Sequence, residues 1–288
     1  MSAITARLSV FFQWVLPRYL VTSIVFHVAR IRNVAVKNFL INRFVSAYKV
    51  NIGELDKPVP EGYESFNAFF TRDLAQGARP LHDTPGAIVA PVDGTVSVAA
   101  AIENNMLIQA KGMRYSLDQL LATDLPEAGA FVGGRFATIY LAPYNYHRVH
   151  APMAGVLRAA RYVPGDLFSV NAATASLLPG LFARNERLVC HFETDNGPYV
   201  LIFVGALNVG SITTPWTGEI RPQKRGVVVD CELSEKDASR NVATGELLGW
   251  FNMGSTVILL LPDGRGEWLE TLQTGKTLRM GEAIGQLS

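Results

Sequence analysis

The interpretation of this chain rests on thirteen residues near its end: Gly249-Trp250-Phe251-Asn252-Met253-Gly254-Ser255-Thr256-Val257-Ile258-Leu259-Leu260-Leu261. The apolar run behind Ser255 predicts a buried strand. Gly254 and Ser255 lie at the entrance to this strand. Because Gly-Ser pairs are common in turns, the simplest interpretation is a turn that leads into a strand.

Ser255 also has a chemical interpretation. With a base nearby, its hydroxyl could attack the carbonyl carbon of Gly254 in its own backbone. We expect glycine to favour this attack, because it lacks Cβ, tolerates strained φ and ψ angles and lets an oxygen approach closely. An acyl shift followed by elimination would cut the chain before Ser255 and leave a pyruvoyl ketone in its place.

The composition predicts a globular chain with an ample core. Its 288 residues suffice for one large domain or two small ones, and 49% of them are hydrophobic. A formal net charge of +1 argues against a nucleic-acid partner. Cys190 and Cys231 lack the spacing of metal ligands, so we expect both to be reduced core residues.

The charges are unevenly distributed along the chain. The first acidic residue is Glu54, whereas residues 1–50 contain seven basic ones: Arg7, Arg18, Arg30, Arg32, Lys37, Arg43 and Lys49. Apolar residues lie between them, but no uncharged run reaches the roughly 20 residues of a membrane span. We therefore predict that residues 1–75 form amphipathic helices on an anionic membrane surface. The alternative is a helical cap on the core with a solvated basic face.

Residues 76–288 have a different texture, with short apolar runs separated by Gly and Pro, which predicts a β-rich domain. Two motifs recur in outline: residues 90–96 (APVDGTV) as 151–157 (APMAGVL), and residues 245–251 (GELLGWF) as 281–287 (GEAIGQL). We predict an α+β, mainly β fold with a duplicated core like a barrel-sandwich hybrid. Short helices are expected at 64–72, 116–122 and 171–177.

His147 and His150 are the best candidates for a base that could serve Ser255, since histidine titrates near neutral pH. Asp93 lies in a turn that the internal repeat makes equivalent to the turn just after His150. Turns related in this way can converge in space, so Asp93, His150 and Ser255 could form a relay. A turn aspartate and structural histidines are the alternatives. The His-x-x-His pair lacks a third ligand of suitable spacing, so no metal is expected.

The ordered motifs of the chain resemble those of bacterial phosphatidylserine decarboxylases of the pyruvoyl-dependent, prokaryotic type I. The likeness extends over nearly the whole length. One departure is Met253, where the family usually has leucine, a change that conserves volume and apolarity. The motifs that carry the resemblance are residues 66–70 (FNAFF) with Arg72, Arg79-Pro80, 91–94 (PVDG), 140–143 (YLAP), 147–150 (HRVH), 164–171 (PGDLFSVN), 182–187 (FARNER), 204–206 (VGA), Val209-Gly210 and 253–256 (MGST).

The resemblance implies a role for each matching residue. Ser255 becomes a covalent pyruvoyl group, the only cofactor, which forms a Schiff base with phosphatidylserine so that phosphatidylethanolamine and CO2 are released. Asp93 and His150 serve the self-cleavage between Gly254 and Ser255, and His147 lies near the reacting substrate. Tyr140 and Ser169 are weaker candidates for contact with the headgroup. Cleavage would give a long β chain (1–254) and a short α chain (255–288).

The resemblance also implies partners and a location. The two cleaved chains would form a heterodimer, with a dimer of heterodimers left open. The enzyme would be a peripheral protein on the cytoplasmic face of the bacterial inner membrane, where its substrate lies. Three other classes remain as alternatives: an Asp-His-Ser hydrolase that acts uncut, a lipoyl-like carrier, and a pyruvoyl decarboxylase of a soluble amino acid. A carrier would need a lysine at a hairpin tip, which neither repeat offers.

Overall fold

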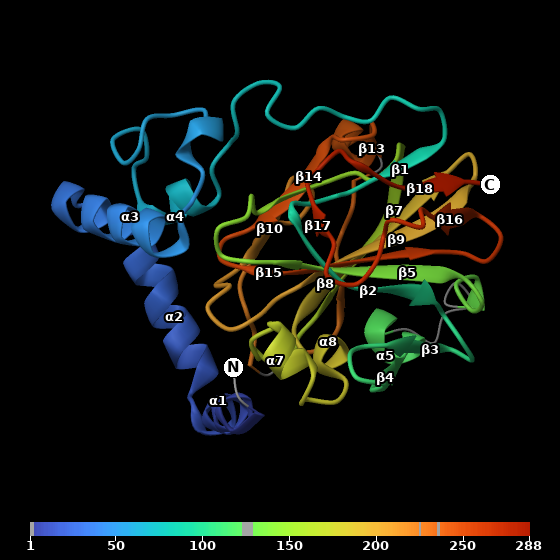
Figure 1. The fold of residues 1–288 in the computed structure, drawn as a ribbon, viewed down its shortest axis with the longest axis horizontal. Coiled ribbons are helices and arrows are strands. Elements are labelled where there is room, and N and C mark those ends of the chain that lie inside the picture. The colour runs from blue at the N-terminus through green and yellow to red at the C-terminus, as the bar shows by residue number, and fades with distance from the viewer. Residues whose placement is uncertain (1–2, 123–128, 225, 235–236) are drawn as a thin grey trace.

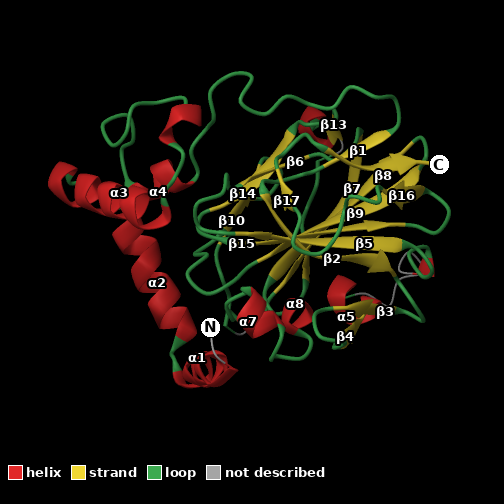
Figure 2. Ribbon diagram, viewed as in Figure 1, coloured by secondary structure: helices red, strands yellow, loops and turns green. Residues whose placement is uncertain are grey.

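The structure is a computed structural model, and it describes residues 3–122, 129–224, 226–234 and 237–288 (Figure 1). It is mainly β, as predicted, and the strands of its four sheets pair in antiparallel fashion. Figure 2 shows the strands gathered in one body, with the three longest helices along one side of it. These helices are α1 (Ala3–Val15), α2 (Arg18–Ala29) and α3 (Val34–Tyr48).

The largest sheet has nine strands and supplies the core. Its order is β12 (Val229–Asp230), β7 (Gly155–Val163), β8 (Arg187–Thr194), β9 (Gly197–Val204), β15 (Ser255–Leu261), β5 (Arg135–Leu141), β2 (Gly94–Ala101) and β17 (Thr277–Leu278), and β13 (Asn241–Val242) also pairs with β7. All seven residues of β15 are buried. A strand buried on both faces has a continuous apolar sequence rather than an alternating one, which explains the run behind Ser255.

Three smaller sheets complete the β structure. One contains β11 (Gly218–Ile220), β10 (Ile212–Thr214), β14 (Leu247–Phe251) and β6 (Arg148–His150). A second contains β1 (Ala87–Val89), β18 (Ala283–Leu287) and β16 (Gly266–Trp268). The third is the hairpin of β3 (Met106–Ile108) and β4 (Arg114–Ser116).

The internal repeat corresponds to a repeated structure. In one copy the Ala90 N–H donates to Glu282 O at 2.8 Å, and the Ala90 carbonyl oxygen accepts from the Gly281 N–H at 3.0 Å. In the other copy Ala151 makes the same pair of bonds with residues 246 and 245. The copies also meet each other, since the His150 N–H donates to Pro91 O at 2.8 Å and the equivalent Val89 N–H donates to Pro152 O at 2.9 Å. The predicted convergence of the two turns is confirmed.

The three predicted short helices are present as α4 (Phe66–Phe70), α5 (Leu117–Leu121) and α7 (Ala172–Ala175). Each begins at a side chain that caps the first turn: Ser65, Ser116 and Asn171 accept a hydrogen bond from the backbone N–H three residues on. A further helix, α8 (Leu181–Arg184), follows α7. Cys190 is buried and Cys231 is half-buried, and both are free thiols.

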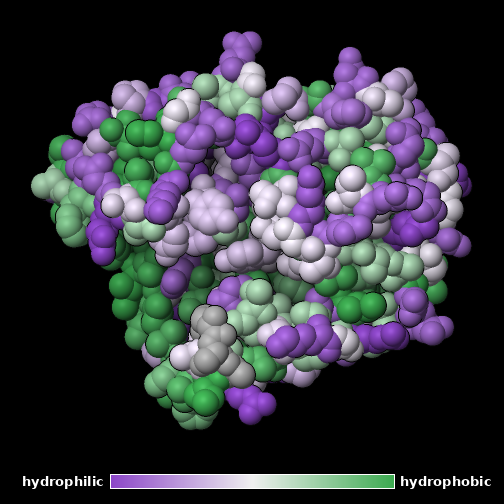
Figure 3. Space-filling view, viewed as in Figure 1, coloured by the Kyte–Doolittle hydropathy of each residue, from purple (hydrophilic) through white to green (hydrophobic). Residues whose placement is uncertain are grey.

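Helices α1 and α2 attach to the core by one face and expose apolar side chains on the other. Their axes are bent by 88° at Leu16 and Pro17. Gln13 and Thr22 are buried against the core, whereas Phe11 and Phe12 are 61% and 66% exposed. Figure 3 shows the resulting apolar patch over these helices. Within the described ranges no single helix qualifies by length and hydropathy as a membrane span; only the bent pair Ile4–Val15 and Arg18–Ala29 meets the criteria jointly.

Candidate active site

Ser255 is the first residue of the central strand β15, and it lines a cavity of about 190 Å³. The strand-end residues Leu141 and Ser255 are paired across β5 and β15, which fixes the depth of the serine in the sheet. The cavity is lined by Phe44, Tyr48, Phe70, Tyr140, Leu141, Pro143, Ser169, Val170, Ala206, Leu207, Asn208, Met253, Gly254 and Ser255. None of these lining residues carries a charge.

The Ser255 hydroxyl is buried and has no hydrogen-bond partner among the described residues. Burying a hydroxyl without a partner costs about 1–3 kcal/mol in proteins, so the position calls for an explanation other than stability. Tyr140 and Ser169 line the same cavity, as expected for residues near the substrate. Their contact with a headgroup stays a prediction.

Gly254 differs from the expectation of a strained backbone. It is absent from the glycines whose φ lies in the left-handed region. A Cβ atom added there would lie 3.5 Å from His147 Nε2 and 3.7 Å from the carbonyl oxygen of Leu141, which are ordinary contacts. The argument from strain was therefore wrong in this structure, whereas His147, one of the two candidate bases, has a ring nitrogen near Gly254.

His147 has the geometry of a neutral base. Its Nδ1–H donates to the carbonyl oxygen of Asn145 at 2.8 Å, which leaves Nε2 as the nitrogen with the lone pair. Nε2 is buried and unpartnered within the described part of the chain. The Phe70 ring packs on the imidazole at a centroid distance of 4.2 Å. A lone pair without a donor therefore lies beside Gly254.

The surroundings of His147 keep it uncharged. Burial, and to a smaller extent the nearby Arg72 guanidinium, lower its pKa to about 3, against the weaker opposing effect of the Asn145 hydrogen bond. Arg72 is itself buried, and it donates to the carbonyl oxygens of Tyr144 at 2.9 Å and Asn145 at 3.1 Å. The Asn145 carbonyl oxygen thus accepts from both Arg72 and His147, so it holds the guanidinium in place and selects the Nδ1–H tautomer of the imidazole.

His150 is held differently. Its Nδ1–H donates to Gly245 O at 2.8 Å, and Nε2 accepts from the Tyr146 hydroxyl at 3.0 Å. Burial is the main cause of its lowered pKa, and the hydrogen bond to Gly245 and, more weakly, the nearby Asp93 oppose that effect. Both ring nitrogens are therefore occupied, and Tyr146, not Ser255, is the hydroxyl on Nε2.

Asp93 is fixed by a cation. Arg79 Nε donates to Asp93 Oδ1 at 2.8 Å and a second guanidinium nitrogen donates to Oδ2 at 2.5 Å, which is a bidentate pair. The Met280 N–H completes the set at 2.8 Å from Oδ1. A second cavity of about 180 Å³ adjoins Asp93 and Tyr146. The carboxylate is thus ordered, near His150, and oriented by Arg79 rather than by the imidazole.

Comparison with known proteins identifies the family of the chain. A family model described as phosphatidylserine decarboxylase matches residues 66–286, and a second, described as PSD, matches residues 8–49. A protein of Ectopseudomonas mendocina called phosphatidylserine decarboxylase proenzyme is 46% identical over 279 residues, covering 97% of this chain and 98% of that protein. The chain belongs to the phosphatidylserine decarboxylase family. It is therefore a carboxy-lyase.

Other members of the family are similar to the same extent. Proteins of Stutzerimonas stutzeri and Bordetella petrii, also called phosphatidylserine decarboxylase proenzyme, are 46% and 45% identical. The match to the Stutzerimonas stutzeri protein covers 97% of this chain and 94% of that protein. The match to the Bordetella petrii protein covers 94% of each. The helices and the β core are thus both part of the shared sequence.

Several residues shape the site although the sequence predicted no role for them, even where they belong to a family motif. Arg79 and Arg72 are two of them, and a third is Asn67, whose Nδ2 donates to Asn252 O at 2.8 Å. Asn252 in turn donates from Nδ2 to Ser211 Oγ at 2.7 Å. Tyr146 directly precedes His147, and its spacing of four residues from His150 was the available signal.

Proposed function

We propose that this chain converts phosphatidylserine to phosphatidylethanolamine and CO2, using a pyruvoyl group that it makes from its own Ser255. One observation carries the proposal: an unpartnered, buried serine hydroxyl at a strand end, beside an uncharged cavity and an unpartnered, neutral imidazole. The membership in the family supports it. A pyruvoyl group there would supply a ketone that takes up the substrate amine and accepts the electrons released when CO2 leaves.

Maturation is assigned to the residues around the Gly254–Ser255 bond. The Ser255 oxygen attacks the Gly254 carbonyl carbon, the Gly254–Ser255 amide bond breaks and an ester forms in its place. Loss of the Ser255 α-proton then releases the carboxylate of Gly254 and leaves dehydroalanine, which water converts to the ketone with loss of ammonia. We assign the removal of the hydroxyl proton to His150, whose charged form the nearby Asp93 favours. Since Tyr146 occupies Nε2, this assignment requires that Tyr146 yields or relays the proton.

Turnover is assigned to His147. Its Nε2 lies beside Gly254, so a proton that this lone pair takes up during the reaction can be passed to the carbon that loses CO2. The uncharged lining also favours the reaction, because a carboxylate in this cavity meets no cation that would stabilise it before CO2 leaves. The phosphate of the headgroup would have to be held by hydroxyl groups such as those of Tyr140 and Ser169.

The membrane assignment follows from the helices. Residues 1–75 would lie on the cytoplasmic face of the bacterial inner membrane as a peripheral anchor, and residues 76–288 would form the barrel-sandwich-hybrid-like catalytic domain. Helices α1 and α2 contact the loops that line the reaction cavity, since Gln13 Oε1 accepts from the Ser169 N–H at 2.8 Å and Thr22 Oγ1 accepts from the Asn208 N–H at 3.2 Å. The cut chains 1–254 and 255–288 would stay together as a heterodimer, and two heterodimers could associate.

The test is a mass spectrum and a denaturing gel of purified protein. We expect two bands, and a small fragment lighter by one ammonia than the serine-started peptide of residues 255–288. Ser255→Ala should give one band and no activity. The matched control is Thr256→Val, which removes the neighbouring buried hydroxyl and should still be cut. A single uncut chain that is active would overturn the proposal and favour a hydrolase.

The two histidines are separated in the same assay. His150→Ala should block cleavage, whereas His147→Ala should permit cleavage and abolish turnover. The reverse result would exchange the two assignments. The comparison matters because His147 Nε2 lies beside Gly254, at the bond that is to be cut.

A further inference from the structure

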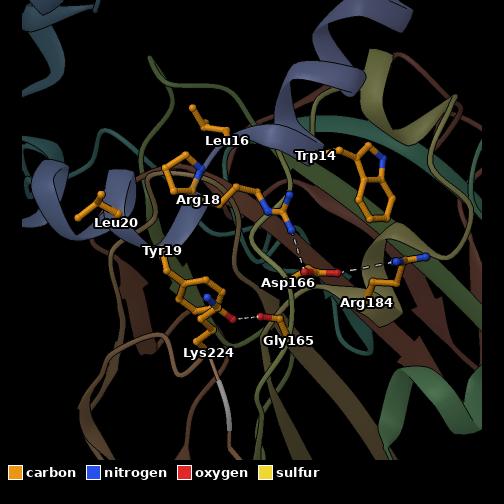
Figure 4. A pocket seen from close by; sticks show the side chains of 10 residues that line it. Trp14, Leu16, Arg18, Tyr19, Leu20, Gly165, Asp166, Arg184 and Lys224 are labelled. Carbon is orange, nitrogen blue, oxygen red and sulfur yellow. Dashed lines mark hydrogen bonds and ion pairs between the residues drawn. The ribbon is translucent and has the colours of Figure 1, made fainter.

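Another cavity, larger than the reaction cavity, lies against the N-terminal helices. It has a volume of about 890 Å³ and lies between the bend that joins α1 to α2 and two parts of the core, the loop at 165–166 and the end of α8 (Figure 4). We call it the elbow cleft, and its lining residues are Trp14, Leu16, Pro17, Arg18, Tyr19, Leu20, Gly165, Asp166, Arg184 and Lys224. It shares no lining residue with the cavity at Ser255.

The elbow cleft carries an excess of positive charge. Arg18 and Arg184 lie on either side of the one carboxylate of the lining, Asp166, with N–O distances of 3.0 Å and 3.8 Å, and Figure 4 shows all three converging. Lys224 forms no ion pair within the described ranges. Three cations therefore face one anion, and the balance is two positive charges in a concave site. An anionic ligand of about that charge would complete it.

The mouth of the cleft is apolar on the side of the helices. Trp14 and Leu20, which line it, are 51% and 59% exposed, and the apolar patch of α1 and α2 continues from them. A ligand that combines a phosphate group with acyl chains matches this combination, since the phosphate would meet the cations and the chains would run along the patch. A free phosphate would use the cations alone.

The cleft also contacts the wall of the reaction cavity. The Arg18 guanidinium lies 3.9 Å from the centroid of the Phe168 ring, and Trp14 packs edge-on against the same ring at 5.0 Å. The next residue, Ser169, lines the reaction cavity. Occupancy of the cleft would therefore fix the segment that forms one wall of the site.

We propose that the elbow cleft binds the phosphate headgroup of an anionic phospholipid that is not the molecule being decarboxylated, and that this second lipid orders the wall of the reaction cavity. The inference rests on the proposed attachment of α1 and α2 to a membrane. It goes beyond that attachment because it assigns a specific headgroup site to Arg18, Arg184 and Lys224.

The experiment compares two charge-matched double variants of the full-length, matured protein. The cleft variant is Arg184→Gln with Lys224→Gln, which leaves the Arg18–Asp166 pair intact. The control is Lys111→Gln with Lys276→Gln, two exposed residues that do not line the cleft. Binding is measured by co-sedimentation with phosphatidylcholine vesicles that contain phosphatidylglycerol, which is anionic and is not a substrate. Turnover is measured on a short-chain soluble phosphatidylserine, with and without those vesicles.

We expect the cleft variant to bind these vesicles about tenfold more weakly or worse, from the loss of two cations near an anionic surface, and to lose activation by them. The control should bind within about threefold of the parent, through long-range attraction alone. Equal weakening of both variants, or of neither, would overturn the headgroup site. Inorganic phosphate that activates as well as the vesicles would overturn the choice of a lipid. Failure of the proposed function would instead appear as a lack of cleavage or of turnover in the parent itself.

Discussion

Glu186 offers a quantitative test of how the core around the active site is built. Its side chain is buried, Oε2 accepts from the Tyr162 hydroxyl at 2.9 Å, and Oε1 has no partner within the described structure. Burial raises the pKa of this carboxyl to about 7, against the smaller lowering effect of the Tyr162 hydrogen bond. A Cβ added at Gly205 would lie 2.6 Å from Glu186 Oε1, so the carboxyl packs directly on the backbone next to Ala206 of the reaction cavity.

The perturbation is Glu186→Gln, made in the uncut Ser255→Ala chain. Between the unfolded pKa of about 4.5 and the folded pKa of about 7, the folded state holds the proton more tightly, so the free energy of unfolding falls as pH rises. A difference of about 2.5 pKa units corresponds to about 3 kcal/mol, which is fully lost above pH 7. Glutamine has no charge to bury, so the variant should escape this loss.

The assay is denaturant unfolding at a series of pH values from about 4 to about 8, and the quantity of interest is the difference between variant and parent. We expect this difference to rise in favour of the variant by about 3 kcal/mol across the range. Glu232→Gln, at an exposed position, is the control and should give a flat difference. A flat difference for Glu186→Gln as well would refute the reasoning, because the carboxyl would then ionise in the folded chain as easily as in the unfolded one.

Three further predictions concern the site and the helices. Arg72→Met removes a cation that lowers the pKa of His147, so the acid limb of the pH–kcat profile should move to higher pH. Arg72→Lys keeps the charge and should move the limb less. An unmoved limb in both variants would contradict the electrostatic role of Arg72. Asn67→Ala removes the 2.8 Å bond to Asn252 O, worth about 1 kcal/mol, and should slow cleavage about fivefold in a gel time course; cleavage at the parental rate would exclude a positioning role. Deletion of residues 1–50 should reduce activity on bilayers far more than on detergent-dispersed substrate, and equal loss on both would argue against the anchor.

Local patterns predicted those parts of the fold that local patterns control. The buried strand behind Ser255, the capped short helices and the mainly β class follow from hydrophobic runs, capping residues and turn residues within a few positions of each other. The repeat of residues 90–96 predicted that two distant turns meet, because equivalent hydrogen bonds recur when a motif is duplicated. The domain boundary after residue 75 and the roles of Asp93, His150 and Ser255 stay predictions.

The partners of the site residues could not be predicted in the same way. Asp93 pairs with Arg79, which is fourteen positions away, and His150 bonds to Gly245, which is ninety-five positions away. Either residue could have met many others, since nothing local in the sequence distinguishes one buried polar partner from another. The placement of His147 Nε2 depends on a backbone carbonyl, which every residue possesses and no sequence pattern identifies.

The location of β15 in the middle of the large sheet has a consequence for any break in front of Ser255. Residues 255–261 are hydrogen-bonded to β5 on one side and to β9 on the other, and the following segments pair with β2 and with β1. A fragment released at this point would keep every one of those backbone ladders, so scission would free one new terminus at the cavity without loosening the body of the protein. The molecule can thus change its covalent connectivity while its shape persists.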